Sequence, residues 1–231
     1  MKQEGLKKTF IHEMQQKIFS GELQIGQQLP PERELAVCYG VSRSLINTGI
    51  LELERQGFVR IIPRQGSIVA DYRKNGTLDV LVALTNCKAK LVDYPLFCNM
   101  VDMRVLIECE CARLACVQAT LEELDTLGTF VHCMRVCGDP LDAVEPLVSF
   151  HYKITQISGN AVYAMTFKSF EPMVKSLARQ HLNAAPDLPK TAKLHGDLLT
   201  AMYARDTDRS AQCMRLCLLQ GMSAMKKIYK R

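Results

Sequence analysis

Hydrophobic residues at the start of the chain recur at helical spacing. Leu6, Phe10, Met14 and Ile18 share one face, and the pattern stops at the Ser-Gly pair at 20–21. Apolar residues three to four positions apart form the buried stripe of an amphipathic helix, and glycine is typical of a helix end. We therefore predict a first helix that ends at this pair.

Two further helices follow after a short connector. Pro30-Pro31 suits a first helical turn, because proline lacks the N–H that would be unpaired there, and Gly40 is expected to end this second helix near Tyr39. Ser42 is a plausible N-cap for a third helix over residues 43–56, and Gly57 is suited to its C-terminal cap.

A β-hairpin is predicted next, in "FVRIIPRQGSIVA" at 58–70. Two short β-branched runs flank a Pro-Arg-Gln-Gly turn. The order helix, helix, turn, helix, hairpin describes a winged helix-turn-helix over residues 1–70, which is a DNA-binding fold. The polar stretch at 71–77 is interpreted as a linker.

The remainder of the chain, residues 78–231, shows helical periodicity without strand alternation, so we predict a second, all-α domain, a bundle of six to seven helices. The fold class is mostly α. The expected helical segments are 78–90, 94–118, 120–137, 139–158, 160–183, 187–205 and 207–230.

Composition and charge limit the cellular location of the protein and the kind of partner it can bind. No apolar run reaches the roughly 18 residues of a membrane span, and the N-terminus does not resemble a signal peptide, so a cytoplasmic protein without a membrane partner is expected. The net charge is only +5, and residues 1–70 hold nine Lys/Arg against seven Glu. DNA binding must then depend on a few well-placed cations. The ten cysteines include no CxxC pair and are interpreted as packing residues.

The start of the third helix is the predicted base-reading element. In a helix-turn-helix the second helix of the pair enters the major groove, and its N-terminal residues reach the base edges. These are Ser42, Arg43, Ser44 and Asn47. Arginine can bind guanine or phosphate, asparagine can pair with adenine, and the serines can bind either.

Other cations lie at the remaining contact points of this topology. Arg33 suits a backbone or groove-edge contact, and Arg64, Gln65 and Gly66 form the hairpin tip, where a cation can enter the minor groove. Each arginine alone would be an ordinary solvated charge. Because they occur together at the contact points of one fold, we predict a DNA interface.

The stretch "GQQLPPERELAVCYGVSRS", with "LELERQGFV" and "RQGSIVA", closely resembles the winged-helix domain of the GntR family of bacterial transcription regulators. The resemblance implies a homodimer on a short palindromic operator, with Arg33, Arg43 and Gly66 at the DNA. Two positions depart from the family pattern. Asn47 stands where the family usually has Arg, and Gly49 stands where it usually has Ala, at a helix-propensity cost of about 1 kcal/mol.

The second domain, through "SFHYKITQISGN" and "LHGDLLTAMYARD", resembles the FadR-like subfamily with its helical ligand-binding (FCD) domain. The resemblance implies an Asp and three His around a divalent metal beneath a small-carboxylate effector site. His151 and His195 match two of the histidines. The third falls on Cys217 and the Asp falls on Leu147, so the four-ligand site is not intact.

Two interpretations of this cluster stay open. His151, His195 and Cys217 could hold a metal ion, and a thiolate would favour Zn²⁺. Alternatively the metal has been lost, and these residues are core or pocket groups, with His151 and His195 still at an effector site.

Arg104 and Glu108 lie one helical turn apart, which is typical of an ion pair. By the resemblance, Arg104 is also the candidate to hold an effector carboxylate, which its planar guanidinium suits. Asn160 is expected to cap a helix. His132 and His181 carry no motif and are interpreted as surface or packing residues.

The leading hypothesis is a DNA-binding transcription regulator, most simply a repressor, whose operator binding responds to a small organic acid. It is not expected to be an enzyme. The alternatives are a thiol-responsive regulator that uses the cysteines and, with less support, a metal-dependent enzyme built on the histidine and cysteine cluster.

Overall fold

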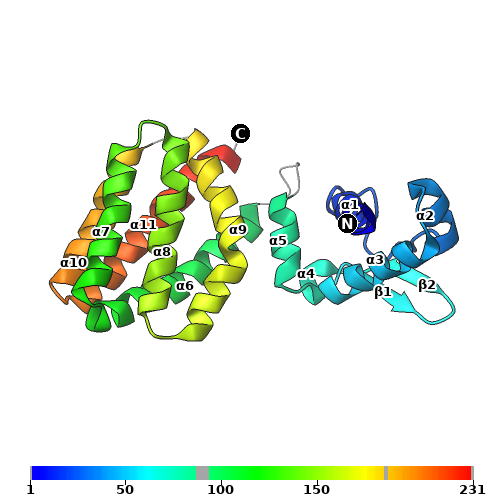
Figure 1. The fold of residues 1–231 in the computed structure, drawn as a ribbon, viewed down its shortest axis with the longest axis horizontal. Helices are drawn as coiled ribbons and strands as arrows, with labels where there is room; N and C mark the ends of the chain where they lie inside the picture. Colours follow the sequence, from blue (N-terminus) through cyan, green and yellow to red (C-terminus); the bar gives the residue numbers. More distant parts are fainter. Residues whose placement is uncertain (1, 87–93, 185–186, 230–231) are drawn as a thin grey trace. The chain divides into compact units, whose positions relative to one another are not determined.

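The computed structural model describes residues 2–86, 94–184 and 187–229. The chain divides into two compact units, residues 1–91 and 92–231. Figure 1 shows the course of the helices and strands in each unit. None of the described helices is long and apolar enough to cross a membrane.

The first unit is the predicted winged helix-turn-helix. Its elements are α1 (Lys2–Phe19), α2 (Glu32–Tyr39), α3 (Arg43–Gln56), β1 (Val59–Ile62), β2 (Gly66–Val69), α4 (Tyr72–Asn75) and α5 (Leu78–Asn86). Helices α1 and α2 both pack on α3 (Figure 1). Most of the apolar face predicted for the first helix is buried, with Phe10, Met14 and Ile18 at most 4% exposed, but Leu6 near the start of the helix is 43% exposed.

The caps of α3 follow the sequence prediction. The Ser42 hydroxyl accepts a hydrogen bond from the Leu45 amide at 3.2 Å. At the other end Gly57 has φ of 88°, and the Phe58 amide donates to the Leu53 carbonyl. A β-carbon at Gly57 would also lie 2.4 Å from the Asn75 carbonyl oxygen, so glycine is required here for both conformation and space.

The wing is a two-stranded antiparallel hairpin in which Val59 pairs with Val69 and Ile62 with Gly66. The connector between α1 and α2 joins it: Gln28 bridges to Ile68, and its side-chain amide donates to the Gln65 carbonyl. The hairpin is therefore held along its second strand as well as by the turn.

The residues after the wing differ from the expected linker. Within 71–77 the chain forms the short helix α4, and α5 packs on α1 and α3. An ion pair between Arg55 and Asp79, with 3.0 Å between nitrogen and oxygen, adds to this contact. The packing of α5 thus makes residues 78–86 part of the first unit, whereas the functional division at 1–70 and 78–231 stays a prediction. Residues 87–90 of the helix predicted at 78–90 lie outside the described residues.

The second unit is the predicted all-α bundle. Its elements are α6 (Tyr94–Gln118), α7 (Leu121–Val136), a 3₁₀ turn η1 (Pro140–Ala143), α8 (Val144–Ile157), α9 (Ala161–Ala184), α10 (Leu188–Tyr203) and α11 (Thr207–Tyr229). The segment predicted as one helix at 139–158 is η1 followed by α8. Asn160 caps α9 as expected, since its side-chain oxygen accepts from the Val162 amide at 3.0 Å.

Helix α6 is central to this bundle and contacts α8, α10 and α11 (Figure 1). Its C-terminal third includes four small residues that are fully buried, Cys111, Ala112, Ala115 and Cys116. Small side chains let neighbouring helices approach closely, and free cysteine behaves here as a small hydrophobe. The packing interpretation does not extend to every cysteine, because Cys38 and Cys133 are exposed.

Gly49 has a packing reason that its sequence context did not reveal. A β-carbon there would lie 2.5 Å from Cδ1 of Phe10, whose ring is 1% exposed and packs edge-to-face on Tyr39. The Phe10 ring therefore occupies the space that an alanine side chain would need.

We expect Gly49→Ala to lower the free energy of unfolding of the first domain by about 1–2 kcal/mol, because the overpacking cost exceeds the gain in helix propensity. Urea unfolding of the full chain, followed by circular dichroism, measures this. Gly5→Ala is the matched control, since a β-carbon at Gly5 meets nothing within 4 Å. Stabilisation of similar size in both variants would contradict the packing argument. In a Phe10→Leu background, Gly49→Ala should cost less, because the smaller side chain leaves room for the β-carbon.

Candidate functional sites

The predicted base-reading residues lie together at the exposed start of α3. Arg43, Ser44 and Asn47 are exposed, as is the capping residue Ser42. The Ser42 hydroxyl accepts one bond as the helix cap, which leaves its O–H donor and a second lone pair for DNA. The first amides and the positive dipole end of a helix can also bind a phosphate.

Asn47 has a partner within the protein. Its Nδ2 donates to Oε1 of Glu32, the first residue of α2, at 2.9 Å. This bond joins the two helices of the helix-turn-helix across their exposed ends. The bond uses one of the two Nδ2 hydrogens, so the other hydrogen and the side-chain oxygen are left for a base, and the assignment of Asn47 as a base-reading residue stays a prediction.

The other predicted DNA contacts are also accessible. Arg33 on α2 and Arg64 and Gln65 at the wing tip are exposed. Among the described residues, Arg33, Arg43 and Arg64 make no ion pair, whereas Arg55 near the end of α3 is paired with Glu52. Arg64 has φ of 66° and Gly66 has φ of 95°, so the tight turn sets the arginine at the tip of the wing.

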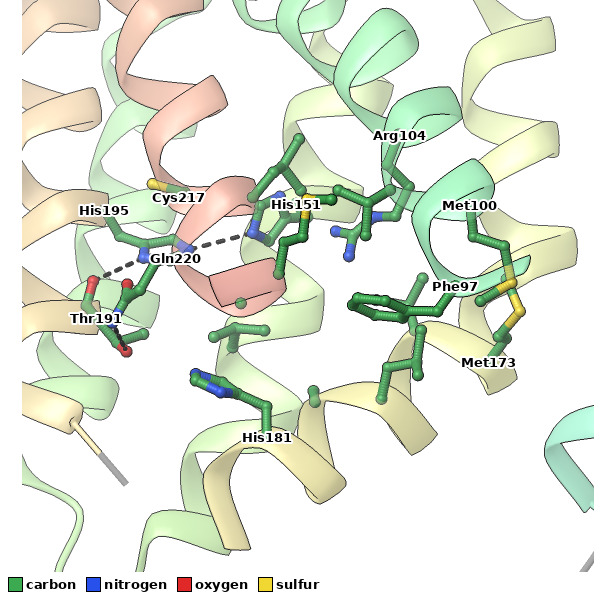
Figure 2. A pocket seen from close by; sticks show the side chains of 18 residues that line it. Phe97, Met100, Arg104, His151, Met173, His181, Thr191, His195, Cys217 and Gln220 are labelled. Atoms are coloured by element: carbon green, nitrogen blue, oxygen red, sulfur yellow. Dashed lines mark hydrogen bonds between the residues drawn. The ribbon is translucent and has the colours of Figure 1, made fainter. Parts of the chain in front are cut away.

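A pocket in the second unit gathers the residues predicted from the carboxylate- and metal-binding resemblance. Arg104, Leu147, His151, His195 and Cys217 all line it. They come from four helices, and most of the remaining lining is apolar (Figure 2). A concave, mainly apolar cavity with a few converging polar groups is the usual form of a small-molecule site.

Arg104 and Glu108 form the predicted ion pair, with 2.5 Å between Nε and Oε1. Glu108 is 1% exposed, and its second oxygen accepts a hydrogen bond from Nδ1 of His151 at 2.6 Å. Burial acts to raise the pKa of Glu108, but the Arg104 cation and His151 outweigh it and lower the pKa to about 2. Glu108 is therefore an anion that fixes both neighbours, a role that the sequence did not indicate for His151.

The two histidines face each other. Their Nε2 atoms are 3.2 Å apart, and Nδ1 of His195 donates to the Thr191 carbonyl at 2.7 Å. Burial lowers the pKa of His195 to about 3, so its ring is neutral and its Nε2 can only accept.

The same two nitrogens would fit two positions on a metal ion, because a ligating histidine usually has its other nitrogen held by an acceptor. The rest of the predicted set does not fit. Leu147 cannot ligate, and burial raises the pKa of the Cys217 thiol far above its usual range, so a metal ion would have to displace the thiol proton. Within the described ranges, no group of three or more His, Cys, Asp or Glu is arranged to hold a metal. A zinc site requires more than two protein ligands.

Several pocket residues carried no signal in the sequence analysis. Gln220 lines the pocket and donates to the Thr191 hydroxyl at 3.1 Å. Phe97 and His181 also line it, and both are buried. His181 was interpreted as a surface or packing residue, but it follows Val174, Leu177 and Ala178 on one face of α9, which is a helical-spacing signal for burial.

Both domains match known families. Residues 6–69 match "Bacterial regulatory proteins, gntR family", and residues 99–220 match the FCD domain. The putative L-lactate dehydrogenase operon regulatory protein of Escherichia coli K12 is 26% identical over 211 residues, covering 89% of this chain and 80% of that protein. The HTH-type transcriptional regulator Mce2R of Mycobacterium tuberculosis is 24% identical over 201 residues, with 84% and 82% covered.

Solved structures share the fold. Lar, described as controlling the agr system of Listeria monocytogenes, aligns with a TM-score of 0.68 at 16% identity, covering 96% of this chain and 97% of that one. McbR/YncC of E. coli aligns with a TM-score of 0.56 at 16% identity, covering 97% and 98%. A winged helix-turn-helix followed by an effector-binding helical domain is the architecture of regulators, and the suggestion of a metal-dependent enzyme was wrong. The chain therefore belongs to the GntR family of bacterial regulatory proteins, as an FCD-domain transcription regulator that binds DNA.

Proposed function

We propose that this regulator is a cytoplasmic homodimer that represses transcription from a palindromic operator, and that a small carboxylate in the pocket of the helical domain modulates its DNA binding. The observation that carries the effector proposal is the pocket itself, in which a guanidinium and two histidines converge within an apolar lining. Relatives named for an L-lactate dehydrogenase operon and a Glc operon support control of a metabolic operon.

Arg104 is the proposed carboxylate ligand. Its bonds to Glu108 use Nε and one Nη2 hydrogen, which leaves further N–H donors on the guanidinium for a ligand. The side chain is 16% exposed and lies against the Phe167 ring, 6.0 Å from its centroid. Glu108 thus orients the arginine and offsets part of its charge, and the remaining donors can form charge-assisted hydrogen bonds with a carboxylate. His151 and His195 complete the proposed effector site.

The homodimer is supported by exposed apolar side chains on the bundle. Leu106 and Val117, on α6, are 77% and 69% exposed, and Leu216 on α11 is 48% exposed. Large apolar side chains exposed on packed helices commonly belong to an interface. A two-fold dimer would present two recognition helices to two half-sites, which is the basis for expecting a palindromic operator.

A DNA-binding titration tests this function. Fluorescence anisotropy would follow the full chain on duplexes from the DNA that flanks its gene, with and without each member of a panel of small organic acids. We expect at least one acid to change the affinity about tenfold, within the usual range of allosteric coupling. Arg104→Gln should keep DNA binding and lose the response. If every acid leaves the affinity unchanged, the effector proposal fails.

The metal prediction can be tested by restoring the ligands that the family resemblance implies at positions 147 and 217. We expect the wild-type protein, purified without added metal, to contain less than one equivalent of zinc, because only two ligands converge. The double variant Leu147→Asp/Cys217→His should gain a divalent ion and a metal-dependent rise in stability, about 2.7 kcal/mol when the ion is at 100 times its Kd. Elemental analysis and thermal unfolding with Zn²⁺ measure both. Stoichiometric zinc in the wild type would contradict this expectation and favour the site of His151, His195 and Cys217.

The thiol-responsive alternative receives no support from Cys111 and Cys217, two of the buried cysteines. Burial raises the pKa of Cys111 to about 11 and that of Cys217 further, so both thiols are protonated near neutral pH. Reactive regulatory cysteines require the opposite shift. Insensitivity of DNA binding to mild peroxide is therefore expected.

A further inference from the structure

One side chain in the pocket has an unsatisfied buried atom. His181, on α9, lines the pocket and is 9% exposed, and its Nδ1 has no hydrogen-bond partner among the described residues. It is the one buried side-chain nitrogen or oxygen in the described part of the chain for which this holds. Such atoms are rare in native proteins, because burying a polar group without a partner is costly.

The neighbouring polar groups of the pocket are satisfied within the protein. His195 bonds to both His151 and Thr191, and Gln220 donates to the Thr191 hydroxyl. Figure 2 shows His181 reaching into the pocket from α9, on the side of Gln220 and Thr191, while Arg104 enters from α6 beside Phe97. The pocket therefore has two polar ends, and at the His181 end a partner is missing.

We propose that His181 determines effector specificity, and that its Nδ1 hydrogen-bonds a second polar group of the bound acid, apart from the carboxylate at Arg104. This inference rests on the proposed effector function. Arg104 would recognise the charge that the effector shares with other acids. His181 would distinguish the effector from acids that lack the second group.

The second group is uncharged. Burial lowers the pKa of His181, although Asp187 acts in the opposite direction, so the imidazole is neutral near pH 7. A second carboxylate would lie beside a neutral ring among apolar residues such as Val174, Leu177 and Leu218, without a cation to offset its desolvation. A hydroxyl group can bond Nδ1 in either tautomer of the imidazole, and a carbonyl oxygen can accept from Nδ1 in the tautomer that carries its proton, both at lower cost. The expected ligand class is a hydroxy- or oxo-monocarboxylic acid.

Calorimetric titration of the full chain with matched acids tests this. The probes are butyrate, 3-hydroxybutyrate, 4-hydroxybutyrate and acetoacetate, with succinate for the second charge. We expect at least one hydroxy or oxo acid to bind the wild type about tenfold more tightly than butyrate, as for one buried hydrogen bond. His181→Leu should reduce that ratio to about one and leave butyrate affinity within about twofold. His181→Asn, whose amide lies near the position of Nδ1, should retain part of the preference.

The outcomes separate this inference from the proposed function. If acids bind the wild type and fail to bind Arg104→Gln, but His181→Leu weakens butyrate and its hydroxy forms equally, the inference alone is overturned. If none of the acids binds the wild type, both are overturned. Without ligand, His181→Leu should melt at or above the wild-type temperature, because it removes an unsatisfied atom. A melting temperature several degrees lower, with the acid preference intact, would mean a structural role and would also overturn the inference.

Discussion

Replacing Glu108 with leucine is expected to lower the free energy of unfolding of the C-terminal domain by about 3–5 kcal/mol. The carboxylate is 1% exposed and bonds both Arg104 and His151. Its removal leaves a cation and an imidazole N–H inside the bundle without their acceptor. Thermal and urea unfolding followed by far-ultraviolet circular dichroism measure the loss, and the transition of the DNA-binding domain should not move.

A control substitution is available on the same helix, α6. Glu110 pairs with Arg113 at 3.3 Å, but both side chains are at least 40% exposed, so Glu110→Gln should change stability by less than about 0.5 kcal/mol. A double variant, Arg104→Leu/Glu108→Leu, should be less destabilised than the sum of its single changes, because neither charge is left alone. Wild-type stability in Glu108→Leu would show that solvent in the pocket, and not Glu108, balances Arg104.

Arg43→Ala is expected to weaken operator binding by about 1–3 kcal/mol, or roughly 5- to 150-fold, if the guanidinium reads a guanine. Arg43 is exposed at the start of α3, and no described acidic residue pairs with it. A phosphate contact would instead weaken binding to all sequences and reduce the salt slope by about one. Fluorescence anisotropy at several salt concentrations, on operator and unrelated duplexes, distinguishes these two outcomes.

Two variants sharpen this test. Arg55→Ala removes a cation from the same helix, but Arg55 lies in its last turn and pairs with Glu52 and Asp79, so DNA affinity should not change. At the wing tip, Arg64→Asn removes the charge and keeps a residue that tolerates the positive φ of 66°. Its effect should be smaller than that of Arg43→Ala and independent of the base sequence. Equal binding by wild type and Arg43→Ala would refute the placement of α3 in the major groove.

Local signals were enough to predict most of the fold. The caps at Ser42 and Gly57 and the break at Gly40 act within a few residues, so the limits of α2 and α3 could be predicted. The position of α5 could not be predicted, because its contacts with α1 and α3 join residues far apart in sequence. The reason for Gly49 lies similarly in Phe10, about 40 positions earlier.

The pocket could also be predicted only in part from the sequence. The Arg104–Glu108 pair follows from helical spacing, but the contact of Glu108 with His151 spans 43 positions and depends on how α6 and α8 pack. Family resemblance brought Leu147 and Cys217 to notice as altered positions, and both do line the pocket. The resemblance does not single out His181. That its Nδ1 atom has no hydrogen-bond partner can be seen only once the positions of all neighbouring helices are known.

The link between the wing and the α1–α2 connector has a consequence for the thermodynamics of DNA binding. Because Gln28 bridges to Ile68 and holds the Gln65 carbonyl, the hairpin tip is ordered when the domain folds. A free hairpin would lose its conformational entropy only on meeting DNA, and that loss would subtract from the affinity. In this domain the hairpin loses that conformational entropy during folding, before DNA is bound. More of the interaction energy between the few cations of this weakly charged domain and the DNA can then contribute to affinity.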